Sequence, residues 1–132
     1  MAGSLTGKRY ILAVDDSPVM QKLIQDALHD DYCVLVTGNP VDVLTLIYSK
    51  PVSVVLLDVM MPDIDGLELC RTLRTIPQFQ SLPVVMITSK DTPFDKVQGR
   101  MAGANAYITK PFAPDHLRQV VQQLLAPETT SS

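Results

Sequence analysis

Short apolar runs alternate with amphipathic segments five times along this chain, and this alternation constrains the fold more than any other feature. The apolar runs lie at residues 10–14, 34–36, 52–57, 84–87 and 106–108. They are rich in β-branched residues and show no polar alternation, which is typical of strands covered on both faces in a parallel sheet. We therefore expect five parallel strands, each followed by a helix.

The segments between these runs carry apolar residues at every third or fourth position, as in helices that cover a sheet with one face. Two such stripes consist of Val19, Met20, Leu23, Ile24, Ala27 and Leu28, and of Leu117, Val120, Val121, Leu124 and Leu125. Three helix starts share a capping residue followed by proline, at Ser17–Pro18, Asn39–Pro40 and Thr92–Pro93. We expect the last helix to begin at Pro114, and Gly103 to follow the fourth.

Right-handed crossovers between such strands lead to a doubly wound parallel sheet, either flavodoxin-like or half of a Rossmann fold. We expect the flavodoxin-like (βα)5 form of the α/β class, with five strands in the order 2-1-3-4-5. At 132 residues and 46% hydrophobic content, the chain has the size of one domain. We place this domain at residues 9–126, between a flexible N-terminal segment at 1–8 and a flexible C-terminal tail at 127–132.

Composition argues against two classes of function. A nucleic-acid surface needs clustered Lys and Arg, whereas this chain has a net charge of −3, so we expect no direct nucleic-acid binding. No apolar run approaches the length of about 18 residues that a membrane span needs, so we expect a cytoplasmic protein without membrane contact. Cys33 and Cys70 lie in apolar segments without metal-ligand spacing, and we expect buried free thiols.

Three carboxylates stand at the ends of two predicted strands. Asp15 and Asp16 follow the first strand, and Asp58 follows the third. In the order 2-1-3-4-5 these strands are neighbours, so the three side chains should converge at the carboxyl edge of the sheet. Each pair at about 4 Å repels by about 4 kcal/mol at an effective dielectric of about 20, which a cation would relieve. Hard oxygen ligands in small number favour Mg²⁺, or Mn²⁺ in its place.

The same edge should carry a hydroxyl and an ammonium group. Thr88 ends the fourth strand, and Lys110 follows the fifth. A hydroxyl can donate a hydrogen bond to a phosphoryl oxygen, and a lysine can pair with the phosphoryl charge. Together with a carboxylate nucleophile and a metal, these groups predict a phosphoaspartate site.

Four motifs carry a resemblance to a known family: VDDS at the first strand, LLDVMMPDIDGLEL at the third, MITS at the fourth, and GANAYITKPF at the fifth. From Arg9 to Leu125 the chain resembles the CheY-like receiver domains of two-component response regulators. The resemblance assigns a role to each site residue: phosphoacceptor Asp58, Mg²⁺ ligands Asp15, Asp16 and Asp58 with the backbone carbonyl of Met60, phosphoryl contacts Thr88 and Lys110, switch residues Thr88 and Tyr107, and a cis Lys110–Pro111 peptide bond.

A narrower resemblance rests on the segment FDKVQGR at residues 94–100 of the fourth helix. This segment is similar to the PatA, PixG and PilG group of receivers, which act in phototaxis, twitching motility and cell patterning. The resemblance implies that the surface of the fourth helix and fifth strand binds partners. It therefore suggests a role in motility or phototaxis signalling.

The receiver resemblance implies a signalling domain that catalyses only its own phosphorylation and dephosphorylation. A histidine kinase or phosphotransfer protein, or a small phosphodonor, would supply the phosphoryl group. The output would pass to a downstream protein or to an effector domain absent from this sequence. The domain would be a monomer or a weak dimer through the face of the fourth helix and fifth strand.

Two other functions fit a sheet of this kind. A flavodoxin-type electron carrier would need a loop of Ser, Thr and Gly after the first strand, where this chain has DDSP. A metal-dependent aspartyl phosphatase acting on external substrates would need a second acid as general base and a substrate cap, for which we find no insertion.

Several residues of interest also have ordinary structural interpretations. The two Asp residues after the first strand could cap a helix, and Tyr107 could be a half-exposed strand aromatic. We expect loop and core packing for Met60, Met61 and the stripe Phe94, Val97 and Met101. We expect surface positions for His29 and His116, solvated acids at Asp63 and Asp65, and a turn at Gly66.

Two side chains should border the path of the hydrolytic water. Met60 lies two residues after the predicted phosphoacceptor, and Lys90 lies two residues after Thr88. We hypothesise that the bulk of Met60 and the charge of Lys90 set the lifetime of the phosphoaspartate.

Overall fold

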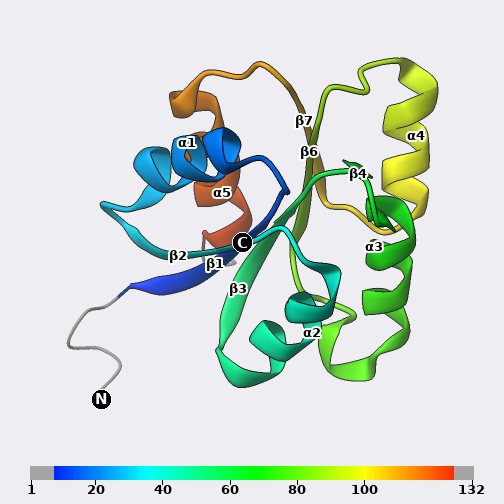
Figure 1. Ribbon diagram of the computed structural model, residues 1–132, viewed down its shortest axis with the longest axis horizontal. Helices are drawn as coiled ribbons and strands as arrows, with labels where there is room; N and C mark the ends of the chain where they lie inside the picture. Colours follow the sequence, from blue (N-terminus) through cyan, green and yellow to red (C-terminus); the bar gives the residue numbers. More distant parts are fainter. Residues whose placement is uncertain (1–7, 127–132) are drawn as a thin grey trace, which may run out of the picture.

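Five parallel strands form the central sheet of the computed structural model, which describes residues 8–126 (Figure 1). The strands are β1 (Arg9–Val14), β2 (Tyr32–Thr37), β3 (Val52–Leu57), β6 (Val84–Thr88) and β7 (Ala106–Thr109). Their order across the sheet is β2-β1-β3-β6-β7, which confirms the predicted flavodoxin-like order. Apart from Lys8, the two end segments predicted to be flexible lie outside the described residues.

Helices cover both faces of this sheet. They are α1 (Pro18–Leu28), α2 (Pro40–Ser49), α3 (Gly66–Thr75), α4 (Pro93–Met101) and α5 (Pro114–Leu125). Figure 1 shows α1 and α5 on one face and α2, α3 and α4 on the other, so the sheet is buried between two layers. Within residues 8–126, no helix is both long and apolar enough to cross a membrane.

Alternate residues of the strands point into two separate hydrophobic cores. Leu12 and Val14 of β1 point into the core under α2 and α3, while Ile11 and Ala13 point into the core under α1 and α5. All four side chains are buried. A strand that is apolar on both sides is the reason for the unalternated runs in the sequence.

The predicted helix starts are confirmed. The Ser17 side chain accepts a hydrogen bond from the backbone N–H of Met20, and the Asn39 side chain accepts one from that of Val41. Thr92 and Asp95 form a capping box at the start of α4. Each of these caps satisfies a backbone donor that the first helical turn leaves without a partner.

Arg74 near the end of α3 ties together the loops at the far end of the sheet from the acidic residues. Its guanidinium donates hydrogen bonds to the carbonyls of Phe79, Leu82 and Gly103 and to the side chain of Asn105. Gly103 ends α4 with a φ of 108°, a conformation that favours glycine. The C-terminal end of α4 is therefore attached directly to α3.

Three short elements were not predicted. After Asp58 the chain forms an antiparallel hairpin of β4 (Met60–Met61) and β5 (Ile64–Asp65), and a 3₁₀ turn, η2 (Pro77–Phe79), follows α3. Two-residue strands are too short to show any periodicity in the sequence. The hairpin carries the backbone from the end of β3 to the start of α3.

The expected core packing of the α4 stripe was wrong. Phe94, Val97 and Met101 are 69%, 53% and 80% exposed. The helix instead turns the small residues Gly99 and Ala102 toward the sheet, and both are buried. Apolar spacing shows that three residues share a helix face, but it does not show which face is covered.

The other ordinary interpretations have mixed outcomes. Met61 is buried as expected, whereas Met60 is 53% exposed. His29 and His116 lie at the surface, and Cys33 and Cys70 are both free thiols. Only Cys70 is fully buried, because Cys33 lies on the edge strand β2, where it is half-exposed.

Candidate phosphoacceptor site

The three predicted carboxylates do converge at the carboxyl edge of the sheet. Asp15 and Asp16 follow β1, Asp58 follows β3, and ligand oxygens of all three lie within 4.8 Å of one another. The Asp15 and Asp58 side chains are buried, while Asp16 is exposed. The backbone N–H of Asp58 donates to the carbonyl of Val14 at 3.0 Å, so pairing between the two strands continues into the site.

Backbone groups orient the two buried carboxylates. Asp15 Oδ1 accepts the N–H of Ser17 at 2.9 Å, and Asp58 Oδ1 accepts the N–H of Met60 at 3.0 Å. Gln21 adds a side-chain hydrogen bond of 2.6 Å to the carbonyl of Asp15. These bonds hold the acids in place and leave the remaining oxygens directed into the site.

Lys110 bridges the two buried acids from the end of β7. Its Nζ lies 2.8 Å from Asp15 Oδ2 and 3.1 Å from Asp58 Oδ2. Burial alone would lower the pKa of Lys110, but its hydrogen bonds to the two carboxylates and their charges outweigh burial and raise that pKa. The lysine is therefore a full positive charge beside the acids. The Lys110–Pro111 peptide bond is cis.

The donor set fits a hard divalent cation. Two buried carboxylates and one exposed carboxylate carry three negative charges, against a single ammonium group that contacts two of them. The remaining charge and the all-oxygen ligands suit Mg²⁺, which retains several waters and binds through few carboxylates. Receiver-type chemistry with Mg²⁺ is therefore compatible with this cluster.

Thr88 and Tyr107 both contact the backbone of Lys90. Thr88 at the end of β6 is fully buried, and its Oγ1 accepts the Lys90 N–H at 3.4 Å. The Tyr107 hydroxyl donates to the Lys90 carbonyl at 2.8 Å. Burial raises the pKa of the Tyr107 phenol, and the charges of Asp95, Asp91 and Asp58 raise it further. One residue of the β6–α4 loop therefore joins the predicted phosphoryl contact to the predicted switch.

Gly66 and Gly38 lie close to the acids. Neither glycine was predicted from the sequence to be part of the site. A Cβ atom on Gly66 would lie 2.3 Å from the carbonyl oxygen of Asp58, and one on Gly38 would lie 2.9 Å from the Cα of Asp16. Gly66 is therefore required for close approach and not for the predicted turn. A glycine directly after the α3 cap Asp65 was the available sequence signal, because glycine is a poor helix former.

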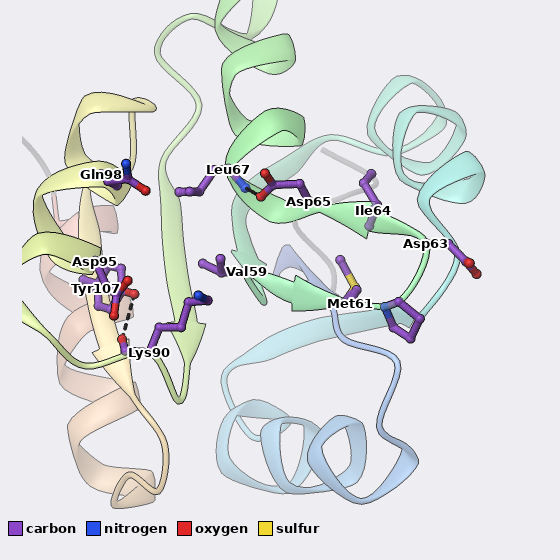
Figure 2. Close-up of a pocket in the computed structure, with 11 residues that line it drawn as sticks. Val59, Met61, Asp63, Ile64, Asp65, Leu67, Lys90, Asp95, Gln98 and Tyr107 are labelled. Atoms are coloured by element: carbon purple, nitrogen blue, oxygen red, sulfur yellow. Dashed lines mark hydrogen bonds between the residues drawn. The ribbon is translucent and has the colours of Figure 1, made fainter.

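A cavity of 590 Å³ lies between the β4–β5 hairpin and α4, and its lining includes Val59, the residue after Asp58. Figure 2 shows Tyr107, Asp95 and Gln98 on its α4 side, Met61 and Ile64 on its hairpin side, and the amine of Lys90 extending between them. Asp63 and Asp65 are exposed as predicted, but Asp65 also caps α3. The cavity is thus bounded by the loops that surround Asp58.

A flavodoxin-like sheet with an acidic cluster and a bridging lysine at its carboxyl edge defines a receiver-type signalling domain. The response regulator receiver domain family matches residues 11–122, and the chain belongs to this family. Membership favours the two-component signalling interpretation over the electron carrier and the phosphatase.

Two curated relatives and two solved structures illustrate the family. The chain is 36% identical over 124 residues to response regulator Rre1 of Synechocystis, an alignment that covers 92% of this chain and 54% of Rre1. The chain thus spans about half the length of Rre1. It is 33% identical over 108 residues to protein PilG of Pseudomonas aeruginosa, covering 81% of this chain and 80% of PilG.

Both solved structures share the fold over almost their whole length. The chemotaxis protein CheY4 of Vibrio cholerae matches with a TM-score of 0.84 and 29% identity, over 90% of this chain and 100% of that one. The BeF3-activated receiver domain of RstA from Klebsiella pneumoniae matches with a TM-score of 0.82 and 32% identity, over 90% and 100%.

Proposed function

We propose that this chain is a phosphorylation switch in which Asp58 accepts a phosphoryl group from a histidine kinase or phosphotransfer protein. A carboxylate oxygen of Asp58 attacks phosphorus, a new O–P bond forms, and the N–P bond to the donor histidine breaks. The observation that carries this proposal is the arrangement of Lys110 Nζ within 3.1 Å of Asp58 Oδ2 and 2.8 Å of Asp15 Oδ2. A cation is thereby held beside one nucleophilic carboxylate among three clustered acids.

The protein groups divide the work between metal binding and charge stabilisation. Asp15, Asp16, Asp58 and the backbone carbonyl of Met60 would hold Mg²⁺ or Mn²⁺, which when bound supplies positive charge to the transferring phosphoryl oxygens. Lys110 would remain paired with the acyl phosphate after transfer, and Thr88 would donate its hydroxyl to a phosphoryl oxygen.

The backbone of Lys90 supports a route from the phosphoryl group to the surface. If the Thr88 hydroxyl turns toward a phosphoryl oxygen, its 3.4 Å contact with the Lys90 N–H is lost. The carbonyl of the same residue holds the Tyr107 hydroxyl at 2.8 Å, so displacement of this loop changes the position of Tyr107. Tyr107 in turn borders the groove between α4 and β7.

The surface of α4 and β7 is our candidate for binding a downstream protein or a further effector domain. Phe94, Val97 and Met101 are exposed there, beside the cationic side chains of Lys96 and Arg100. Exposed apolar residues rimmed by charge are typical of protein interaction sites. We propose a cytoplasmic domain, monomeric or weakly dimeric through this face, and the similarity to PilG supports a role in motility or phototaxis signalling.

The lifetime hypothesis is retained as part of the proposal. Met60 is 53% exposed at the rim of the site, and its sulfur lies 3.8 Å from the hydroxyl of Ser89. Both Met60 and the exposed Lys90 can therefore obstruct or attract the hydrolytic water. Autodephosphorylation rates of Met60→Asn and Lys90→Glu should differ from the parent rate, and equal rates in all three proteins would refute the hypothesis.

Intact-mass measurement after incubation with Mg²⁺ and acetyl phosphate tests the central assignment. The parent should gain one phosphoryl group, Asp58→Asn should gain none, and EDTA should abolish the gain. Asp63→Asn is the matched control, because Asp63 is an exposed acid in the same segment of the chain. A gain in both the parent and Asp58→Asn, or in neither, would overturn the assignment.

A further inference from the structure

Gly99 is the point at which α4 comes closest to the ring of Tyr107. A Cβ atom on Gly99 would lie 2.9 Å from both Cδ2 and Cε2 of Tyr107, whereas ordinary van der Waals contact begins at 3.4 Å. The same Cβ would lie 3.6 Å from Cγ of Met86, which is an ordinary contact. The conflict created by a side chain at residue 99 is therefore specific to the tyrosine ring.

The backbone at Gly99 has no need for glycine. Among the described glycines, Gly103 is the one with positive φ, and Gly99 lies inside α4 with helical geometry. Glycine in a helix interior is disfavoured relative to alanine by about fivefold in the folding equilibrium constant. A glycine that weakens its helix and lies against an aromatic ring indicates a requirement for space.

Three groups form the space that holds Tyr107. Gly99 lies against the ring, Met86 is its neighbour across the β6–β7 register, and the Lys90 carbonyl accepts the hydroxyl hydrogen bond. The ring borders both the 590 Å³ cavity shown in Figure 2 and a second cavity of 400 Å³ between α4 and β7. Tyr107 can therefore leave the first position by turning into the second cavity.

We infer that Gly99 is a positioning residue for Tyr107, and that its missing side chain is what allows the ring to lie against α4 with its hydroxyl on the Lys90 carbonyl. A side chain at residue 99 displaces the ring toward the cavity between α4 and β7. This inference rests on the proposed function only in treating Tyr107 as the residue that reports the state of Asp58.

The two cavities differ in the charges of their linings, so displacement of the Tyr107 ring should change the pKa of its phenol in a defined direction. In the present position the Tyr107 phenol is near Asp95, Asp91 and Asp58, with Lys90 contributing the one cationic side chain that lines the first cavity. The second cavity is lined by the cationic side chains of Lys96 and Arg100 and contains no acidic residue in its lining. Movement of the ring into the second cavity therefore favours the phenolate.

Labelling with 3-fluorotyrosine provides the test, because the chain has four tyrosines and Tyr107→Phe identifies the resonance of residue 107. In Gly99→Ala, the ¹⁹F resonance of Tyr107 should shift at neutral pH and its titration midpoint should fall below that of the parent. The control Phe94→Ala alters an exposed residue of α4 that lines neither cavity, and it should leave both values unchanged. An unchanged Tyr107 resonance and midpoint in Gly99→Ala would overturn the inference.

A double-mutant comparison keeps the inference testable if Gly99→Ala folds poorly. Urea unfolding should show that Gly99→Ala raises the folding equilibrium constant about fivefold in a Tyr107→Ala background, where helix propensity alone acts. In the parent background this gain should be at least about threefold smaller or reversed, because the two residues are in contact. Equal effects in both backgrounds would show that Gly99 does not act through Tyr107.

Phosphorylation is measured in parallel to separate the two proposals. Gly99→Ala should gain one phosphoryl group from acetyl phosphate, as the parent does, because the atoms nearest to the added Cβ belong to Tyr107 and Met86 and not to Asp58 or Lys110. Failure of the parent to gain a phosphoryl group would refute the proposed function while leaving the tyrosine measurements valid.

Discussion

The ammonium group of Lys110 lies 3.1 Å from Asp58 Oδ2, so the predicted nucleophile is paired with a cation supplied by the protein itself. The same ammonium also contacts Asp15 Oδ2 at 2.8 Å. Lysine and a divalent cation would therefore compete for the same two carboxylates. The pairing explains how two buried acids remain tolerated so close together.

Removing this cation should weaken the fold and strengthen metal binding. We expect Lys110→Met to lower the free energy of unfolding of the metal-free protein by about 3 kcal/mol, because two buried carboxylates lose their partner. Mg²⁺ should bind about tenfold or more tightly, since no ammonium opposes it. Urea unfolding followed by circular dichroism and calorimetric Mg²⁺ titration measure the two effects.

Lys96→Met is the matched control, because Lys96 is an exposed lysine on α4. It should change neither stability nor Mg²⁺ affinity. Equal Mg²⁺ affinity in Lys110→Met and the parent would show that lysine and metal do not compete.

Gly66→Ala should disturb the backbone that carries Asp58. The added Cβ would lie 2.3 Å from the Asp58 carbonyl oxygen and 2.8 Å from the Cα of Val59, and backbone atoms cannot turn aside as a side chain can. We expect a loss of about 1–3 kcal/mol in the free energy of unfolding and slower phosphorylation by acetyl phosphate. Glu68→Ala, an exposed change in the same helix, should retain the parent rate.

Arg74→Ala should cost far more than Arg71→Ala, although both arginines lie on α3. Arg74 donates to three carbonyls and the Asn105 side chain, and its loss leaves these acceptors without their charged donor. We expect Arg74→Ala to lower the free energy of unfolding by about 3 kcal/mol. Arg71 makes a solvent-exposed ion pair with Glu68, worth about 0.5 kcal/mol. Comparable urea midpoints for the two variants would contradict the proposed role of Arg74.

Alkaline pH should remove a contribution that the buried Cys70 thiol makes to the free energy of unfolding. Burial raises the pKa of this thiol above its ordinary value of 9.0, and the charges of Arg74 and Arg71 only partly oppose that effect. As the pH rises, the thiol therefore ionises in the unfolded chain before it ionises in the folded protein. The contribution of the buried thiol to stability is complete below pH 9.0 and is lost as the pH rises through the raised pKa.

The stability difference between the parent and Cys70→Ala should accordingly be constant from neutral pH to about pH 8 and narrow above pH 9. Urea unfolding at a series of pH values measures it, and general alkaline destabilisation cancels in the difference. A difference that stays constant through pH 10 would show that the thiol pKa is not raised by folding.

The sheet, its strand order and the acidic cluster could be predicted because each depends on local signals that agree with one another. The strand ending at Val14 leads directly to Asp15, and the strand ending at Leu57 leads directly to Asp58. Once the strand order is known, the position of a residue at a strand end determines which side chains meet. Lys110 and Thr88 were placed at the same edge by this rule.

Close approaches that leave room only for glycine could not be predicted in the same way. The roles of Gly66 and Gly99 depend on how closely a loop or helix approaches a neighbour that is distant in sequence. The exposure of Phe94 and Met101 likewise depends on α4 meeting the sheet through its small residues. Such distances are set by tertiary packing, which a pattern of residue types along the chain does not encode.

The hydrogen bonds from Arg74 to Gly103 and Asn105 give α4 two unequal ends. The C-terminal end is joined to α3, and Asn105 also bonds Val84 of β6 in both directions. The N-terminal end begins in the loop that contains Lys90, and its capping box joins residues of α4 and its own cap. If the loop at Lys90 moves, α4 should pivot about its attached C-terminal end near Gly103. Phe94, at the opposite end of the helix, should then move farther than Met101.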